Sequence, residues 1–266
     1  MSKTIFITGA SSGLGKATVK LFHHKGWNVI ATMRNPENET ELKELKNVTI
    51  MPLDVNNVEQ MHETVSKAIS SHIIDVVFNN AGYGLMGPLE ALSDEKIVRQ
   101  ININLLGVIR ITKLFIPYFK TKKCGLFIST TSIGGFMTFP LSSIYHATKF
   151  ALEGWSESLS YELTKFGIAI KTVAPGAILT DFSGRSADLN SHPEYEEIEK
   201  KLSSTTEAMM QNASTAEQIA KVVYQAVTDG KNQVRYIAGA DANAIYAQQL
   251  ENGADAFRTQ ISKQFL

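Results

Sequence analysis

A tyrosine and a lysine in the stretch SSIYHATKF have the types and the spacing of an acid–base pair. Tyr145 and Lys149 are four residues apart, so on a helix their side chains share one face. A phenol has an ordinary pKa of about 10, and a nearby ammonium group lowers that pKa by stabilising the phenolate. The pair therefore predicts a general acid/base at Tyr145 that Lys149 tunes. Because the same spacing is common on solvent-exposed helix faces, the pair alone does not establish a site.

Two further polar residues could complete such a site. Ser132 ends a predicted strand ahead of Tyr145, and its hydroxyl could hold a substrate oxygen beside the phenol. Asn104 lies in NINLLG on a predicted apolar helix, where an amide is unfavourable unless it has a hydrogen-bond partner. A lone core asparagine is usually a satisfied structural amide, so both interpretations of Asn104 stay open.

The elements that must position these residues follow from an alternation of short apolar runs with helix-patterned stretches. Apolar runs without polar alternation indicate strands buried on both faces, and the intervening helices indicate right-handed crossovers in a parallel sheet. The sequence predicts one α/β domain over residues 1–266: a Rossmann-type doubly wound parallel sheet of about seven strands with helices on both faces. The predicted strands are residues 4–8, 27–32, 48–54, 73–80, 125–132, 168–176 and 235–239.

Two stretches have helical periodicity, and a third breaks the alternation. Residues 14–25 and 143–166 are predicted helices that end at Gly26 and Gly167. Residues 183–211 are polar, charge-rich and only partly periodic. We predict that they form an insertion over the carboxyl edge of the sheet that closes over substrate as a lid.

A glycine-rich turn, TGASSGLG, follows the first predicted strand. Glycines let the chain turn sharply and let a pyrophosphate approach the backbone at the start of a helix. The spacing departs from the usual G-x-G-x-x-G pattern, so simple turn chemistry is the alternative. NNAG at the end of the fourth strand marks the same edge of the sheet. The residues predicted to bind the phosphates are Gly9, Ser11, Ser12, Gly13, Leu14 and Gly15.

Composition narrows the classes of partner. Lys+Arg and Asp+Glu number 26 each, so no overall charge favours nucleic acid or an anionic membrane. The single cysteine, Cys124, excludes an intramolecular disulfide and a cysteine-cluster metal site. No window reaches the ~18 apolar residues of a membrane span. We expect a soluble cytoplasmic protein with no metal, no nucleic-acid partner and no membrane partner.

Taken together, the motifs resemble those of the short-chain dehydrogenase/reductase family, in its compact single-domain branch. The resemblance covers roughly residues 3–240, and the motifs occur in the family's order. The overall pattern, including IATMRNPE and RYIAGADA, most resembles the group of 17β-hydroxysteroid and retinol dehydrogenases. The motifs are TGASSGLG, LDV at 53–55, NNAG, NINLLG, STTSIGG, YHATK and PGAILT at 175–180.

The resemblance implies a role for each polar residue of the reactive set. Tyr145 would be the catalytic acid/base, and Lys149 would lower its pKa and bind the nicotinamide ribose. Ser132 would orient and stabilise the reacting carbonyl oxygen. Asn104 would hold a water that links Lys149 to solvent.

The resemblance also implies the rest of the cofactor site. Pro175 and Gly176 would border the nicotinamide, with Ile178 and Thr180 near its carboxamide. At the other end of the cofactor, the adenine and adenosine side would be lined by Asp54, Val55, Asn80, Ala81 and Gly82.

The end of the second strand bears on the choice of cofactor. In NAD-preferring members of the family an acid stands there, whereas this chain has Met33 followed by Arg34. A guanidinium suits a phosphate, so we predict NADP(H). The alternative is that Arg34 is a loop arginine paired with Glu37 or Glu39.

The resemblance implies an NADP(H)-dependent oxidoreductase that transfers a hydride between nicotinamide C4 and a carbonyl or hydroxyl carbon. Apolar residues of GYGLMGP and of the segment after Ser132 would line a mainly apolar substrate pocket, although core packing explains any one of them equally well. Two alternatives are a catalytically silent dinucleotide-binding regulator and an S-adenosylmethionine-dependent methyltransferase. Helices over about 95–121 and 143–166 would form a homodimer or homotetramer.

Overall fold

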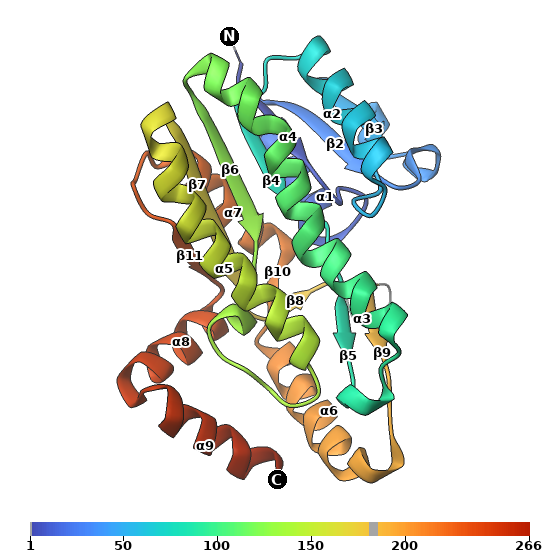
Figure 1. Ribbon diagram of the computed structural model, residues 1–266, viewed down its shortest axis with the longest axis vertical. Helices are drawn as coiled ribbons and strands as arrows, with labels where there is room; N and C mark the ends of the chain where they lie inside the picture. The colour runs from blue at the N-terminus through green and yellow to red at the C-terminus, as the bar shows by residue number, and fades with distance from the viewer. Residues whose placement is uncertain (1, 181–185) are drawn as a thin grey trace.

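The structure is a computed structural model that describes residues 2–180 and 186–266. Its centre is a seven-stranded sheet in which every neighbouring pair is parallel, in the order β11-β7-β6-β4-β1-β2-β3 (Figure 1). The predicted Rossmann-type sheet is confirmed. Its strands are β1 (Thr4–Ile7), β2 (Asn28–Met33), β3 (Val48–Pro52), β4 (Val76–Asn79), β6 (Gly125–Thr130), β7 (Ile168–Pro175) and β11 (Arg235–Ala238).

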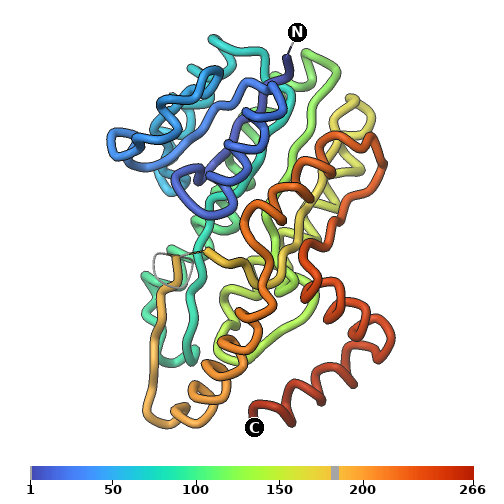
Figure 2. The backbone as a smooth tube through the Cα atoms, turned by 180° about the vertical axis from the view of Figure 1, so that it is seen from behind, coloured from blue at the N-terminus to red at the C-terminus, as the bar shows by residue number. Residues whose placement is uncertain are grey.

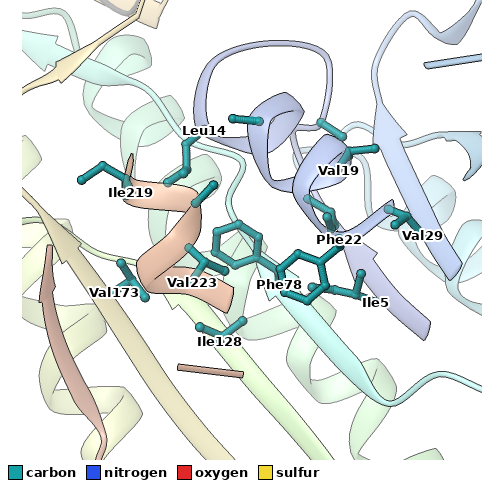
Figure 3. Close-up of a cluster of buried hydrophobic side chains, with 14 of the residues drawn as sticks. Ile5, Leu14, Val19, Phe22, Val29, Phe78, Ile128, Val173, Ile219 and Val223 are labelled. Atoms are coloured by element: carbon teal, nitrogen blue, oxygen red, sulfur yellow. The ribbon is translucent and has the colours of Figure 1, made fainter. Parts of the chain in front are cut away.

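Helices cover both faces of the sheet because its strands are apolar on both faces. In β1, Ile5 and Ile7 pack into one core cluster and Phe6 into the other. Burying each such side chain stabilises the fold by about 1.5–3 kcal/mol. Figure 2 shows the first face, with α1 (Gly13–His24) beside α7 (Ala216–Thr228), and Figure 3 shows Phe22, Phe78 and Val223 meeting in its core. The other face carries α2 (Val58–Ser71), α4 (Gly107–Lys122) and α5 (Ser143–Leu163).

The chain reverses direction across the sheet between β1 and β4. It runs outward from β1 through β2 to β3 and then crosses back to β4 on the other side of β1. Such a switch point leaves a crevice at the carboxyl ends of the strands, where open α/β sheets bind their ligands. The predicted polar residues follow these strand ends.

Smaller elements gather beyond the carboxyl ends of the sheet, in the lower half of Figure 1. Two short parallel pairs form there, β5 with β9 and β8 with β10. Of the predicted insertion, residues 183–185 lie outside the described residues, and the remainder forms β9, a 3₁₀ turn and α6; its action as a lid stays a prediction. These elements are α3 (Asp94–Ile101), β5 (Gly84–Met86), β8 (Ile178–Leu179), β9 (Ala187–Leu189), α6 (Glu196–Gln211), β10 (Ser214–Thr215), α8 (Ala240–Asn252) and α9 (Ala254–Phe265).

Within the described part of the chain, none of the helices has the length and apolar character needed to cross a bilayer.

A buried lysine joins the last two strands of the sheet to α7. Lys171, on β7, donates to the Ala226 carbonyl at 2.7 Å, to Asp229 Oδ1 at 2.9 Å and to the Tyr236 hydroxyl at 3.1 Å. The Tyr236 hydroxyl in turn donates to Asp229 Oδ2 at 2.8 Å. Burial alone would raise the pKa of Asp229, but the hydrogen bond from Lys171 holds it at about 2.

Replacing Lys171→Met should therefore lower the free energy of unfolding by about 3 kcal/mol, because it leaves the Asp229 carboxylate buried without its cation. Urea denaturation at neutral pH measures this. Lys221→Met, an exposed position on α7, is the control and should change stability by less than about 0.5 kcal/mol.

The same network predicts a pH dependence. The folded-state pKa of Asp229 lies below its ordinary 3.8, so its stabilisation is complete above that value and is lost as the pH falls toward about 2. The wild type should lose this increment in acid, and Lys171→Met should not. Equal acid sensitivity of the two proteins would contradict the assignment.

Candidate active site

The glycine turn brings backbone against backbone at the switch point. Gly9 and Gly13 have φ values of +67° and +51°, which favour glycine. A Cβ on Gly9 would lie 2.8 Å from the Cα of Ala81, and one on Gly15 would lie 2.1 Å from the Gly9 carbonyl oxygen. Ser12 is the N-cap of α1 and makes no side-chain cap hydrogen bond. The first amides of α1 therefore have no side-chain acceptor from the cap.

Asn80 ties three strand ends together. Its amide group donates to the carbonyls of Thr8 and Gly9, both at 3.2 Å, and its Oδ1 accepts from the Thr130 hydroxyl at 3.1 Å. The Thr8 hydroxyl accepts from the backbone amides of Asn80 and Ala81 at 2.9 and 3.0 Å. Asn80 therefore joins the ends of β1 and β6 to the end of its own strand, β4.

The predicted acid–base pair lies on one face of α5. Lys149 is buried, its Nζ donates to the Thr130 carbonyl at 2.9 Å, and it lies 5.6 Å from the centroid of the Tyr145 ring. Burial lowers the pKa of Lys149 to about 8, and the nearby charge of Glu153 acts in the opposite direction. At neutral pH Lys149 is therefore mostly charged.

The pKa of the half-buried Tyr145 phenol is shifted in the direction opposite to the sequence-based expectation. Burial raises the pKa of Tyr145, and a hydrogen bond with the Ser132 side chain acts against that rise. The ammonium was expected to lower the phenol pKa, but in the protein alone the loss of hydration is the larger effect. Ser132 lies beside the phenol at the end of β6, as predicted.

Asn104 is buried in a π-helical turn, Asn102–Leu106, between α3 and α4. Its Oδ1 accepts from the Tyr83 amide at 3.0 Å and its Nδ2 donates to the Tyr83 carbonyl at 2.7 Å. Asn104 is thus a satisfied structural amide that holds the chain just after NNAG. Its predicted role toward a water beside Lys149 stays a prediction.

The segment Pro175–Thr180 runs from β7 back toward the glycine turn. The Gly176 amide donates to the Ala238 carbonyl at 3.1 Å, and Ile178 pairs with Ser214 of β10. A Cβ on Gly13 would lie 3.5 Å from Thr180 Cγ2, so the predicted phosphate-binding turn and the predicted nicotinamide segment are neighbours.

The end of β2 places Met33 in the core and Arg34 in solvent. Glu39, the suggested partner of Arg34, instead accepts from Lys16 of α1 at 3.1 Å and from the backbone amides of Glu41 and Leu42. Among residues 2–180 and 186–266, Arg34 forms no ion pair. Asp54 and Val55 lie at the end of β3 beside this strand, and Val55 is buried.

The predicted apolar substrate residues divide between the site and the core. Leu85 and Met137 are almost wholly buried. Phe136, Met137 and Phe139 pack in a cluster with residues of α8 and α9, including Tyr246 and Phe257. Core packing therefore explains much of this apolar segment.

Three residues of the site were missed from the sequence. Thr8 and Thr130 hold Asn80, and Asp241 of α8 accepts from the Ala177 amide at 2.8 Å. A Cβ on Gly176 would lie 2.1 Å from Asp241 Oδ2, so the carboxylate also explains that glycine. RYIAGADA was noticed only as part of a resemblance; an aspartate in the first turn of a helix after a strand was the available signal.

In the part of the chain that the structure describes, no group of three or more His, Cys, Asp or Glu side chains is placed to hold a metal ion.

Comparison with known proteins gives a consistent family likeness. The family model described as short chain dehydrogenase matches residues 3–190. An uncharacterized oxidoreductase of Schizosaccharomyces pombe is 38% identical over 209 residues, which cover 78% of this chain and 88% of that protein. The 3-ketodihydrosphingosine reductase of Bacteroides thetaiotaomicron is 38% identical over 180 residues, covering 67% of this chain and 65% of that protein.

Solved structures share the whole fold. A short-chain dehydrogenase from Streptomyces avermitilis superposes with a TM-score of 0.86 at 27% identity, covering 99% of this chain and 96% of that one. ElxO with NADP bound superposes with a TM-score of 0.76 at 27% identity, covering 92% of this chain and 100% of that one.

The close contact between Gly15 and the Gly9 carbonyl can be tested by a substitution that adds a Cβ. Gly15 lies within α1, where alanine is normally favoured by about 1 kcal/mol, yet its Cβ would meet the Gly9 carbonyl. Gly15→Ala should therefore destabilise the protein by about 1–3 kcal/mol in urea denaturation. Gly154→Ala on α5, where a Cβ meets nothing within 4 Å, is the matched control and should be neutral or stabilising. Similar behaviour of the two variants would contradict the packing argument.

Proposed function

The chain belongs to the short-chain dehydrogenase family and is an oxidoreductase, and from this premise we propose that it uses NADP(H) and acts on a mainly apolar ketone, aldehyde or secondary alcohol. The observation that carries the proposal is the position of Tyr145. Its phenol lies beside Ser132 and Lys149 at the carboxyl edge of the sheet. The glycine turn and Thr180 lie at the same edge.

The chain's own groups fit a dinucleotide. The glycines of the turn Gly9–Gly15 let the start of α1 lie close to the strand ends, and α1 offers amides there without a side-chain acceptor from the cap for a pyrophosphate. Pro175, Gly176, Ile178 and Thr180 would border the nicotinamide end. Asp54, Val55, Asn80, Ala81 and Gly82 would line the adenosine end. When bound, NADPH supplies the hydride.

The residues of the reactive set then act on the substrate oxygen. Tyr145 donates its proton to that oxygen in the reducing direction, and the Ser132 hydroxyl holds the oxygen in place. A phenol with a raised pKa keeps its proton at neutral pH, which suits an acid. The charged Lys149 lowers the cost of the phenolate that remains. Asn104, which is held by the Tyr83 backbone, would hold a water that links Lys149 to solvent.

The preference for NADP(H) rests on the end of β2. Met33 offers no carboxylate to accept hydrogen bonds from ribose hydroxyls or to repel a phosphate. Arg34 is exposed beside it, and Glu39 is engaged by Lys16. A guanidinium suits the 2′-phosphate of the cofactor. ElxO, a structural neighbour, is described with NADP bound.

The substrate class rests on the apolar surroundings of the site. Leu85, Met86 and Met137 would contribute apolar side chains to the substrate side of the site, and none of them carries a charge. A relative, 3-ketodihydrosphingosine reductase, is named for an apolar, lipid-like ketone. The cytoplasmic location stays a prediction, and so does the homodimer or homotetramer. Two large exposed side chains on the outward side of α5, Phe150 at 43% and Tyr161 at 73%, support the proposed oligomer.

The cofactor preference can be measured directly. kcat/KM with NADPH should exceed that with NADH, and Arg34→Asp should shift the ratio toward NADH by a factor of roughly 10–100, because it replaces a charge-assisted contact of about 1.5–3 kcal/mol with repulsion. Lys46→Asp makes a similar charge change at the amino end of β3, far from the site, and should leave the ratio unchanged. Equal efficiency with both cofactors in the wild type would refute the preference.

The role of the phenol is tested by Tyr145→Phe. Loss of a general acid should lower kcat by roughly 10²–10⁴ in a screen of apolar ketones and aldehydes that follows NADPH absorbance. NADPH affinity, measured by fluorescence titration, should change little. Tyr161→Phe, on the exposed side of the same helix, is the control. A wild type that binds NADPH but turns over no substrate would favour the silent regulator instead.

A further inference from the structure

A histidine next to Tyr145 holds the segment that follows Ser132. His146 is 5% exposed, and both of its ring nitrogens meet backbone groups of that segment. Nδ1 lies 2.8 Å from the Gly134 carbonyl oxygen, and Nε2 accepts from the Phe139 amide at 3.0 Å. The two contacts fix one tautomer, since Nδ1 must carry the proton that Gly134 accepts while Nε2 stays free to accept.

The contact at Gly134 extends to the reactive set. The Gly134 amide donates to Ser132 Oγ at 3.0 Å, while the carbonyl of the same residue accepts from His146. A Cβ on Gly134 would lie 2.9 Å from His146 Nδ1 and 3.3 Å from Ser132 Oγ. Gly134 is thus held between the imidazole and the serine hydroxyl, and the position of one constrains the other.

We propose that His146 is a positioning residue that sets the orientation of Ser132 toward the Tyr145 phenol by clamping residues 133–139, and that protonation of its ring releases this clamp. The proposal deepens the proposed function, on which its kinetic part rests. A protonated Nε2 would be a donor facing the Phe139 amide, which is also a donor. The segment would have to move away from α5 to relieve that contact.

Three other titratable groups on α5 lie near the same segment. Tyr145, whose ring centroid is 5.9 Å from that of His146, and Lys149 both titrate above neutral pH. Glu153 lies against Gly135, burial raises its pKa, and its carboxylate accepts from Thr172 and Arg235. α3 also packs on α5, but Lys96 pairs with Asp188 and Arg99 lies over the Tyr83 ring. The segment 133–139 carries no titratable side chain.

Solvent protons can reach the ring, because His146 lines an open, mainly apolar groove of about 550 Å³ with Phe139 and Phe150. Burial lowers the pKa of His146 below its ordinary 6.5. The neutral clamp is therefore complete above that value and is lost progressively as the pH falls below it.

Three substitutions separate the two ring contacts. An asparagine amide reaches the place of Nδ1 and a glutamine amide the place of Nε2, so His146→Asn can keep the Gly134 contact and His146→Gln the Phe139 contact. His146→Ala keeps neither. With NADPH and an apolar ketone, His146→Ala should lower kcat by roughly 10- to 100-fold, the cost of a misplacement of about 1 Å. NADPH affinity should change less than about threefold.

The conservative variants supply the decisive comparison. His146→Asn should retain more kcat than His146→Gln, because Ser132 is aligned through Gly134. The wild type should show a fall in kcat/KM on the acid side of pH 6.5, and both variants should lose it. His24→Gln, an exposed position on α1, is the control and should keep the wild-type profile. An unchanged acid limb in His146→Asn, or an unchanged kcat in His146→Ala, would overturn the proposal.

A second measurement does not depend on turnover. Long-range ¹H–¹⁵N correlation on the wild type should show His146 protonated at Nδ1 at neutral pH. The protection factor of the Phe139 amide, which is its exchange rate corrected for the intrinsic pH dependence, should fall as the ring is protonated. The opposite tautomer, or a Phe139 protection factor that ignores the ring's titration, would overturn the clamp even in an active enzyme. If no ketone is reduced but the tautomer and the exchange behave as expected, the proposed function fails and the clamp stands.

Discussion

The site depends on the amide of Asn80, which joins the end of β1 to the end of β6. Its donors hold the carbonyls of Thr8 and Gly9, and its oxygen accepts from Thr130. The Thr130 carbonyl accepts from Lys149. One side chain therefore fixes the distance between the glycine turn and the acid–base pair. Because all of these groups are backbone or short polar side chains, the arrangement is stiff where a cofactor and a substrate must meet.

Burial, rather than the neighbouring ammonium, controls the charges in this arrangement. It lowers the pKa of Lys149 to about 8 and raises that of Tyr145. Two buried groups thereby move toward their neutral forms, and Glu153 and Ser132 act against that tendency. The phenol keeps its proton and the lysine keeps most of its charge at neutral pH. An acid beside a cation is what protonation of a carbonyl oxygen requires.

The sequence was informative where local pattern decides the structure. Continuous apolar runs predicted all seven sheet strands, and the glycine turn and Ser132 fell at the expected strand ends. The pairs β5–β9 and β8–β10 have strands of only two or three residues, too short for any periodicity to appear. The roles of Thr8, Thr130 and His146 depend on contacts between distant segments, which no local spacing reveals. For Asn104 the pattern left two interpretations open; its contacts with Tyr83 show a structural role, and its role toward a water stays a prediction.

The glycine turn and Lys149 are held by the strand ends, whereas the segments after β7 and after Ser132 are held by the C-terminal helices. The strand ends hold the glycine turn through Asn80 and hold Lys149 of α5 through the Thr130 carbonyl. Asp241 at the start of α8 holds Ala177, and Gln249 of the same helix donates to the Phe136 carbonyl at 2.8 Å. The C-terminal helices therefore contact both the segment after β7 and the segment after Ser132. Because these two segments flank the reactive set, changes in α8 and α9 can reshape the side next to Phe136 and Ala177 while the strand ends and α5 stay in place.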